Sequence, residues 1–249
     1  MPMFWIMLVA SPFIGSFLGV LALRLPEGRS FAVSRSACDH CGHVLAVRDL
    51  VPIASFLALR GRCRYCHAPI GGFVLVIELA AMLVAGWAGI QVSDWILVAS
   101  CLLGWMLLLL AAIDWRVQLL PDVLTLPLLV AGLAVTYFVS PETWSDHLIG
   151  AVAGFVVLGA ISLLYWRLRH REGLGLGDAK LLAALGAWVA WQGLPTVLLW
   201  GSMLGLVFAL VRSMTGRGLQ WSDRIPFGVF LAAGGWLVWL YGPLMPSLR

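Results

Sequence analysis

Charged residues are scarce in this chain. Only 11% of its 249 residues are Asp, Glu, Lys or Arg, whereas 61% are hydrophobic. A soluble globular domain needs a more polar surface, so this composition excludes that class and indicates an all-α, polytopic membrane protein. Internal repeats, low-complexity tracts and flexible linkers are missing as well. The N-terminus lacks a basic leading region and a small-residue cleavage site, so we expect its first apolar stretch to be a retained helix.

Eight apolar stretches follow one another along the chain, and we predict about eight transmembrane helices. Each stretch is about long enough to span a bilayer except the sixth, which is short. The break between the sixth and the seventh is expected over residues 191–195, a segment that contains Gly193 and Pro195. The stretches cover 3–24, 73–93, 95–113, 123–140, 147–166, 179–192, 195–212 and 227–244.

Basic residues are confined almost entirely to alternate loops. Of the 16 Lys and Arg residues, 15 lie in or beside 24–72, Arg116, 167–180 and 212–224. By the positive-inside rule these loops are cytoplasmic, and both termini lie outside the cytoplasm. The net charge of +4 is therefore explained by topology, and we expect no nucleic-acid partner.

The segment 25–72 is the one sizeable polar region, and it holds four of the five cysteines. Two Cys-x2-Cys pairs separated by 21 residues can close four thiolates around one tetrahedral zinc ion. Four thiolates leave no open coordination position, so the predicted zinc is structural. The reducing cytosol disfavours a disulfide, and free or redox-active thiols are the alternative. The predicted ligands are Cys38, Cys41, Cys63 and Cys66, with His40, His43 and His67 as possible replacements that we expect to be solvated neighbours.

Two acidic residues, Asp114 and Asp178, fall at the predicted cytoplasmic ends of apolar helices. Acids in such positions are candidates for a functional site. If the two helices pack together, the carboxylates share a proton, and one can activate water while the other acts on a carbonyl. The alternative is that each acid caps a helix or pairs with a base such as Arg116 or Lys180.

Other polar residues near these helices have simpler expected roles. Gly175 and Gly177 precede Asp178 and allow another backbone to come close. This glycine series is not a dinucleotide fingerprint, because no strand precedes it. Asp122 follows Pro121 and is expected to be the N-cap of the next helix. Glu78 lies inside a predicted helix and is expected to pair with a base or to face a polar cavity.

Four segments together resemble the prepilin peptidases. They are "GSFLGVLALRLP" (15–26), "CDHCGH…RDLVPIASFLALRGRCRYCHAPI" (38–70), "IDWRVQLLPDVLTLPLL" (113–129) and "GLGLGDAKLLAALGAW" (173–188). They occur in the family's order over nearly the whole chain. The Gly175-x-Gly177-Asp178 element is typical of GxGD membrane aspartyl proteases.

The resemblance implies a bacterial inner-membrane enzyme of type IV pilus or type II secretion systems. Asp114 and Asp178 would be its catalytic pair, and the cysteine loop would hold its zinc. Family members cleave a short basic leader from prepilins or pseudopilins at the cytoplasmic face. Many then methylate the new N-terminus with S-adenosylmethionine. The acids Asp39, Asp49 and Asp122 would suit a basic leader.

Three departures from the family pattern stand out. Many relatives carry a second acid where this chain has Arg116, and the Asn of "GSFLNV" is Gly19. The segment "Ser-x-Arg-Tyr-Pro-Leu-Val-Glu" is replaced by "GGFVLVIE" at 71–78. The last two changes fall in the half associated with methylation, so they put that activity in question, whereas the protease motifs are intact.

These observations divide the chain into a first transmembrane helix (1–24), a cytoplasmic zinc-binding loop (25–72) and a helical bundle with the protease site (73–249). Two other functions suit parts of the pattern. A proton-coupled transporter also places acids in broken helices, but its acids lie at the midplane and its repeats are inverted. A non-catalytic assembly factor would use the zinc loop to dock a partner.

Overall fold

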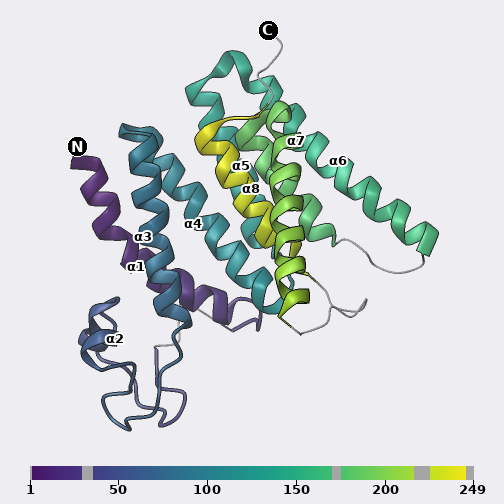
Figure 1. The fold of residues 1–249 in the computed structure, drawn as a ribbon. Coiled ribbons are helices and arrows are strands. Elements are labelled where there is room, and N and C mark those ends of the chain that lie inside the picture. Colours follow the sequence, from purple (N-terminus) through teal and green to yellow (C-terminus); the bar gives the residue numbers. More distant parts are fainter. Residues whose placement is uncertain (1, 30–35, 170–174, 216–224, 245–249) are drawn as a thin grey trace. The chain divides into compact units, whose positions relative to one another are not determined.

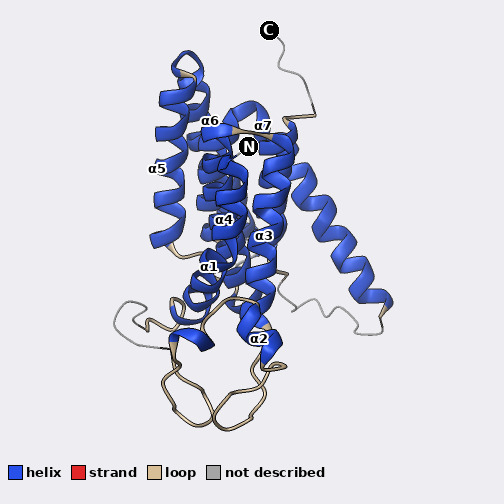
Figure 2. Ribbon diagram, turned by 90° about the vertical axis from the view of Figure 1, so that its left-hand side faces the viewer, coloured by secondary structure: helices blue, strands red, loops and turns tan. Residues whose placement is uncertain are grey.

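The computed structural model describes all residues except 1, 30–35, 170–174, 216–224 and 245–249 (Figure 1). Its described parts contain helices, turns and two isolated β-bridges, and no strand (Figure 2). The chain forms two compact units, Met1–Leu109 and Leu110–Arg249.

The first unit contains the cysteine loop and two helices that pack against each other, α1 (Pro2–Arg24) and α3 (Phe73–Gln91). Gly15 marks their closest approach, since a Cβ added there would lie 2.6 Å from the Cα of Glu78. The first part of α4 (Asp94–Val117) also belongs to this unit. The Trp105 indole N–H donates to the carbonyl of Ala81 (3.1 Å) and joins α4 to α3.

The second unit contains the end of α4 together with α5 (Asp122–Val139), α6 (Trp144–Arg169), α7 (Leu176–Met214) and α8 (Phe227–Tyr241). Helix α7 is central, because it packs against α5, α6 and α8. Small residues let α6 and α7 cross closely, as is common between membrane helices. A Cβ on Gly186 would lie within van der Waals overlap of the Gly150 backbone.

Six described helices are long and apolar enough to cross a membrane, and α8 is a shorter apolar helix. The observed spans agree with the predicted stretches, and the all-α, polytopic membrane class is confirmed. Helix α4 runs to Val117, four residues beyond the predicted end. Asp114 therefore lies in its last helical turn.

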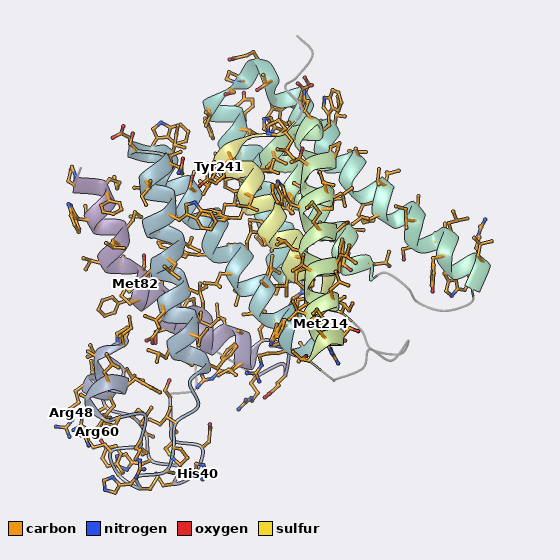
Figure 3. The ribbon with its side chains drawn as sticks, viewed as in Figure 1. His40, Arg48, Arg60, Met82, Met214 and Tyr241 are labelled. Atoms are coloured by element: carbon orange, nitrogen blue, oxygen red, sulfur yellow. The ribbon has the colours of Figure 1, made fainter. Side chains whose placement is uncertain are left out.

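Helix α7 contains the break that the sequence indicated, but at Ala190 rather than within 191–195. Ala190 has non-helical dihedral angles (φ 58°, ψ 175°). The chain reverses there, since Leu185 packs on Gly235 and Val197 packs on the neighbouring Gly234. A straight helix would hold Leu185 and Val197 about 18 Å apart. Helix α7 is thus a hairpin of two segments. Met214, at its end, and Tyr241, at the end of α8, lie at opposite ends of this group of helices (Figure 3).

Candidate active site and metal site

The four loop cysteines converge on one point. All four Sγ atoms lie within 4.8 Å of one another, and those of Cys38 and Cys66 are 3.8 Å apart. Tetrahedral zinc with Zn–S bonds of about 2.3 Å holds its sulfurs about 3.8 Å apart. The cluster therefore has the donor set and the spacing of a structural zinc site.

The two Cys-x2-Cys pairs lie in matching turns. Cys38 donates its backbone N–H to His43 (2.9 Å), and Cys63 donates to Ala68 (2.9 Å) in the same register. In each turn the residue after the second cysteine has a positive φ, 69° at Gly42 and 58° at His67. In these turns backbone amides point at the sulfurs of Cys38 and Cys66.

The electrostatics of the sulfurs also suit a cation. Backbone N–H groups of Cys41 and His40 lower the pKa of the Cys38 thiol to about 6. At Cys66 the Ala68 amide favours the thiolate, but desolvation and the neighbouring sulfurs outweigh it and raise the pKa to about 12. Sulfurs that cannot all ionise side by side become thiolates together when a divalent cation lies between them.

The side chain of Asp114 lies against the start of α8. It is 5% exposed, and its Oδ2 accepts the backbone N–H of Val229 at 3.1 Å. Helix N-termini carry unpaired N–H groups and a partial positive charge, so a carboxylate is a suitable partner there. The preceding residue must be small, because a Cβ on Gly228 would lie 2.9 Å from the same oxygen.

Asp178 is the third residue of α7 and is 9% exposed. Its backbone N–H bonds to the carbonyl of Gly175 (3.1 Å) in the first turn. Gly175 is exposed, and a Cβ on it would lie 3.6 Å from Asp178 Oδ2. Gly173, in the expected glycine series, lies outside the described residues.

The two carboxylates meet around Leu120, in the loop between α4 and α5. A Cβ on Gly177, next to Asp178, would lie 3.0 Å from Leu120 Cβ, and one on Gly228 would lie 3.0 Å from Leu120 Cδ1. Asp114 and Asp178 are close enough to interact electrostatically. The structure thus brings together the two acids that the sequence singled out, and Gly177 faces Leu120 rather than open space.

Asp122 and Lys180 form an ion pair beside this site. Lys180 Nζ lies 2.6 and 2.8 Å from the two oxygens of Asp122. The prediction of Asp122 as an N-cap is wrong by one position, since Pro121 is the N-cap and Asp122 begins α5. The ion pair also removes one alternative for Asp178, because Lys180 pairs with a different acid.

Glu78 has neither a base nor a polar cavity as its partner in the described contacts. Its Oε2 accepts the backbone N–H of Ile53 at 2.7 Å, at the start of the short helix α2 (Ala54–Ala58). Sequence reasoning missed this contact and the amides of α8, because a backbone N–H leaves no mark in a sequence. The only signal for the α8 contact was Pro226, which marks the helix start.

Comparisons with known proteins find family matches for both halves of the chain. Residues 9–92 match the family model described as the bacterial peptidase A24 N-terminal domain, and residues 101–210 match the type IV leader peptidase family. No solved structure matches the chain.

Three similar proteins carry the printed name prepilin leader peptidase/N-methyltransferase. The protein of Burkholderia pseudomallei (strain K96243) is 44% identical over 219 residues, which cover 88% of this chain and 71% of the relative. That of Aeromonas hydrophila is 40% identical, with 96% and 91% covered. That of Pseudomonas aeruginosa is 37% identical, with 92% and 87% covered.

Proposed function

Because the chain belongs to the type IV leader peptidase family, we propose that Asp114 and Asp178 form the aspartyl pair of a membrane endopeptidase. The substrates are type IV prepilins or type II secretion pseudopilins, whose short basic leader is removed at the cytoplasmic face. The observation that carries the proposal is the meeting of two buried carboxylates from separate helices around Leu120.

The reaction needs one proton shared between the two acids. The ionised carboxylate takes a proton from water, and the oxygen of that water attacks the scissile carbonyl carbon while the protonated acid donates to the carbonyl oxygen. Collapse of the resulting diol transfers a proton to the leaving nitrogen and breaks the C–N bond. Asp114 Oδ2 accepts the backbone N–H of Val229, and this hydrogen bond orients the carboxylate.

A prepilin with an apolar helix would lie in the bilayer, with its cleavage site at the membrane surface near both acids. The expectation that Asp49 and Asp122 attract a basic leader finds no support, because they pair with Arg64 and Lys180. Asp39 is the remaining candidate of the three.

The test mixes detergent-solubilised enzyme with a pilin-like precursor and follows loss of the leader. Asp114→Asn and Asp178→Ala should each abolish cleavage, and the double variant should be no worse, since the pair acts as a unit. The control is Asp146→Asn, an acid that bonds to Trp191 and Gln192 near the reversal of α7. Full cleavage by a folded Asp178→Ala protein would contradict the proposal.

Zinc, methylation and orientation belong to the same proposal. Cys38, Cys41, Cys63 and Cys66 would hold one structural zinc, and S-adenosylmethionine would supply the methyl group for the new N-terminus. The basic loops would face the cytoplasm of a bacterial inner membrane, with both termini outside. A transporter or a non-catalytic assembly factor is not favoured, because the similar proteins are named as peptidases.

Methylation depends on a region where two departures from the family pattern touch. A Cβ on Gly19 would lie 3.2 Å from Val74 Cγ1, so the residues that stand for the family's Asn and Tyr pack on each other. Mass spectrometry of the cleaved product tests the activity. An unmodified N-terminus in the presence of S-adenosylmethionine would show that the Gly71–Phe73 and Gly19 departures have cost this activity. Loop cysteine variants should impair methylation more than cleavage.

A further inference from the structure

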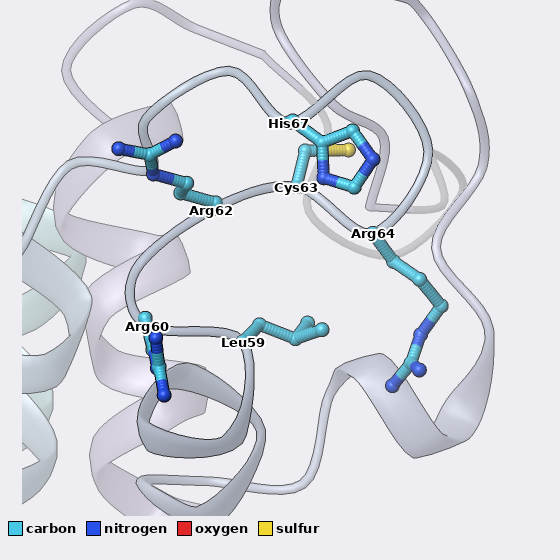
Figure 4. A pocket seen from close by; sticks show the side chains of 6 residues that line it. All are labelled: Leu59, Arg60, Arg62, Cys63, Arg64 and His67. Carbon is cyan, nitrogen blue, oxygen red and sulfur yellow. The ribbon is translucent and has the colours of Figure 1, made fainter.

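A cavity of about 520 Å³ opens in the cysteine loop. Figure 4 shows Arg60 and Arg62 at one rim, Arg64 at the opposite rim and Leu59 between them. The remaining lining residues are Cys63 and His67. Three arginines line this cavity, and their guanidinium groups leave its rim in different directions (Figure 4). Guanidinium groups favour anionic ligands, and the planar fork of each matches a phosphate group.

One of the three arginines is already neutralised. Arg64 Nε lies 2.7 Å from Asp49 Oδ1, and this hydrogen bond holds the pKa of Asp49 below its ordinary value. Arg60 and Arg62 have no ion pair with any residue that the structure describes. Their charges are therefore the ones left for a ligand.

Two hydrogen bonds donated by backbone N–H groups hold the loop close to the start of α3. Ile53 donates to Glu78, which lies about 7.5 Å along α3 from Phe73. Ile70, three residues before Phe73, donates to the carbonyl of Gly61 at 2.7 Å. Three residues span at most about 10 Å, and the headgroup layer is about 5–8 Å thick. With α3 entering the hydrocarbon near Phe73, the backbone beside Arg60 and Arg62 would lie within the reach of an arginine side chain from the lipid phosphates.

Apolar side chains close to the Ile53 contact are exposed. Leu57 in α2 is 64% exposed and Val51 is 40% exposed. Amphipathic segments with exposed apolar and basic residues can lie in the membrane interface, where the apolar side chains enter the acyl boundary and the basic ones contact headgroups.

We propose that residues 51–64 lie on the bilayer surface, and that Arg60 and Arg62 bind the phosphate of an anionic lipid headgroup. The loop is on the predicted cytoplasmic side, where the leaflet is negatively charged. Each arginine near such a surface contributes about a 5-fold preference, so the pair gives about 30-fold.

The experiment titrates delipidated, full-length protein in detergent with phosphatidylglycerol or phosphatidylcholine and counts bound lipids by native mass spectrometry. One phosphatidylglycerol should bind about 30-fold more tightly than phosphatidylcholine. Arg62→Gln should reduce the preference about 5-fold, and Arg60→Gln with Arg62→Gln should remove it. The double variant Arg60→Lys with Arg62→Lys keeps the charge and should retain most of the preference.

Arg48→Gln is the matched control. It removes one positive charge from the same loop, but Arg48 does not line the cavity. It should change the preference less than 2-fold. An equal loss in Arg48→Gln and Arg62→Gln would overturn the site and leave only diffuse charge. Loss of the wild-type preference in sodium phosphate at constant ionic strength would also overturn it, because the cavity would then take free phosphate rather than lipid. Melting temperatures identify any variant that fails to fold. If the double glutamine variant does not fold, the comparison of Arg62→Gln, Arg48→Gln and the double lysine variant decides the test.

Discussion

Replacing Gly228 with alanine tests whether α8 positions Asp114. An alanine in a helix is normally favourable by about 0.5–1 kcal/mol relative to glycine. Here its Cβ would lie 2.9 Å from Asp114 Oδ2, and ordinary contact begins at 3.4 Å, so the carboxylate must move by 3.4 − 2.9 = 0.5 Å. A misplacement of about 1 Å costs on the order of 100-fold in rate, so half of that displacement should cost about 10-fold.

The loss should appear in kcat rather than in KM, because the carboxylate acts on the reacting atoms and not on the apolar helix of the substrate. The assay measures both constants for leader removal, with melting temperature as the check on folding. Gly205→Ala in α7 is the control. Its Cβ would meet Phe230, which lies in α8 as Gly228 does, at an ordinary contact distance of 3.4 Å. Wild-type kcat in a folded Gly228→Ala enzyme would refute the argument that this contact places Asp114.

Three further predictions concern the rest of the molecule. Purified protein should contain about one zinc per chain, and replacing Cys41 and Cys66 by serine should lower that content and destabilise the loop, as elemental analysis and limited proteolysis would show. Lys180→Met should reduce stability by less than about 1 kcal/mol and cleavage by less than about 10-fold, because its ion pair with the exposed Asp122 lies at the surface. A complete loss of cleavage would mean that Lys180 acts in the reaction. If methylation is absent, Gly19→Asn should not restore it by itself, because Val74 fills the space beside Gly19, and product mass measures the outcome.

The sequence was sufficient for the elements whose signals are local. Long apolar runs gave helix bounds within a few residues, and the spacing of the cysteine pairs identified a cluster whose sulfurs do converge. The break in α7 was predicted slightly late because Gly193 and Pro195 are stronger breakers than Ala190, which favours helix. Those two residues instead lie early in the second segment, after the chain has reversed.

The parts that could not be predicted all depend on contacts between distant residues. The Val229 amide meets Asp114 across 115 positions of sequence, and Lys180 meets Asp122 across 58. Either acid could have paired with a nearer base on local grounds. Only the packing of α5, α7 and α8 in the second unit decides which partner each acid has.

The first segment of α7 is short for a helix that we expect to begin at one membrane surface and turn at the other. From Leu176 to Val189 it has 14 residues before the reversal at Ala190, a length of about 21 Å against a hydrocarbon thickness of about 30 Å. A bilayer adapts to such a mismatch by thinning around the protein. We therefore expect lipid headgroups and water to dip toward Asp178, so that a buried acid at the end of a short helix remains within reach of the water that hydrolysis consumes.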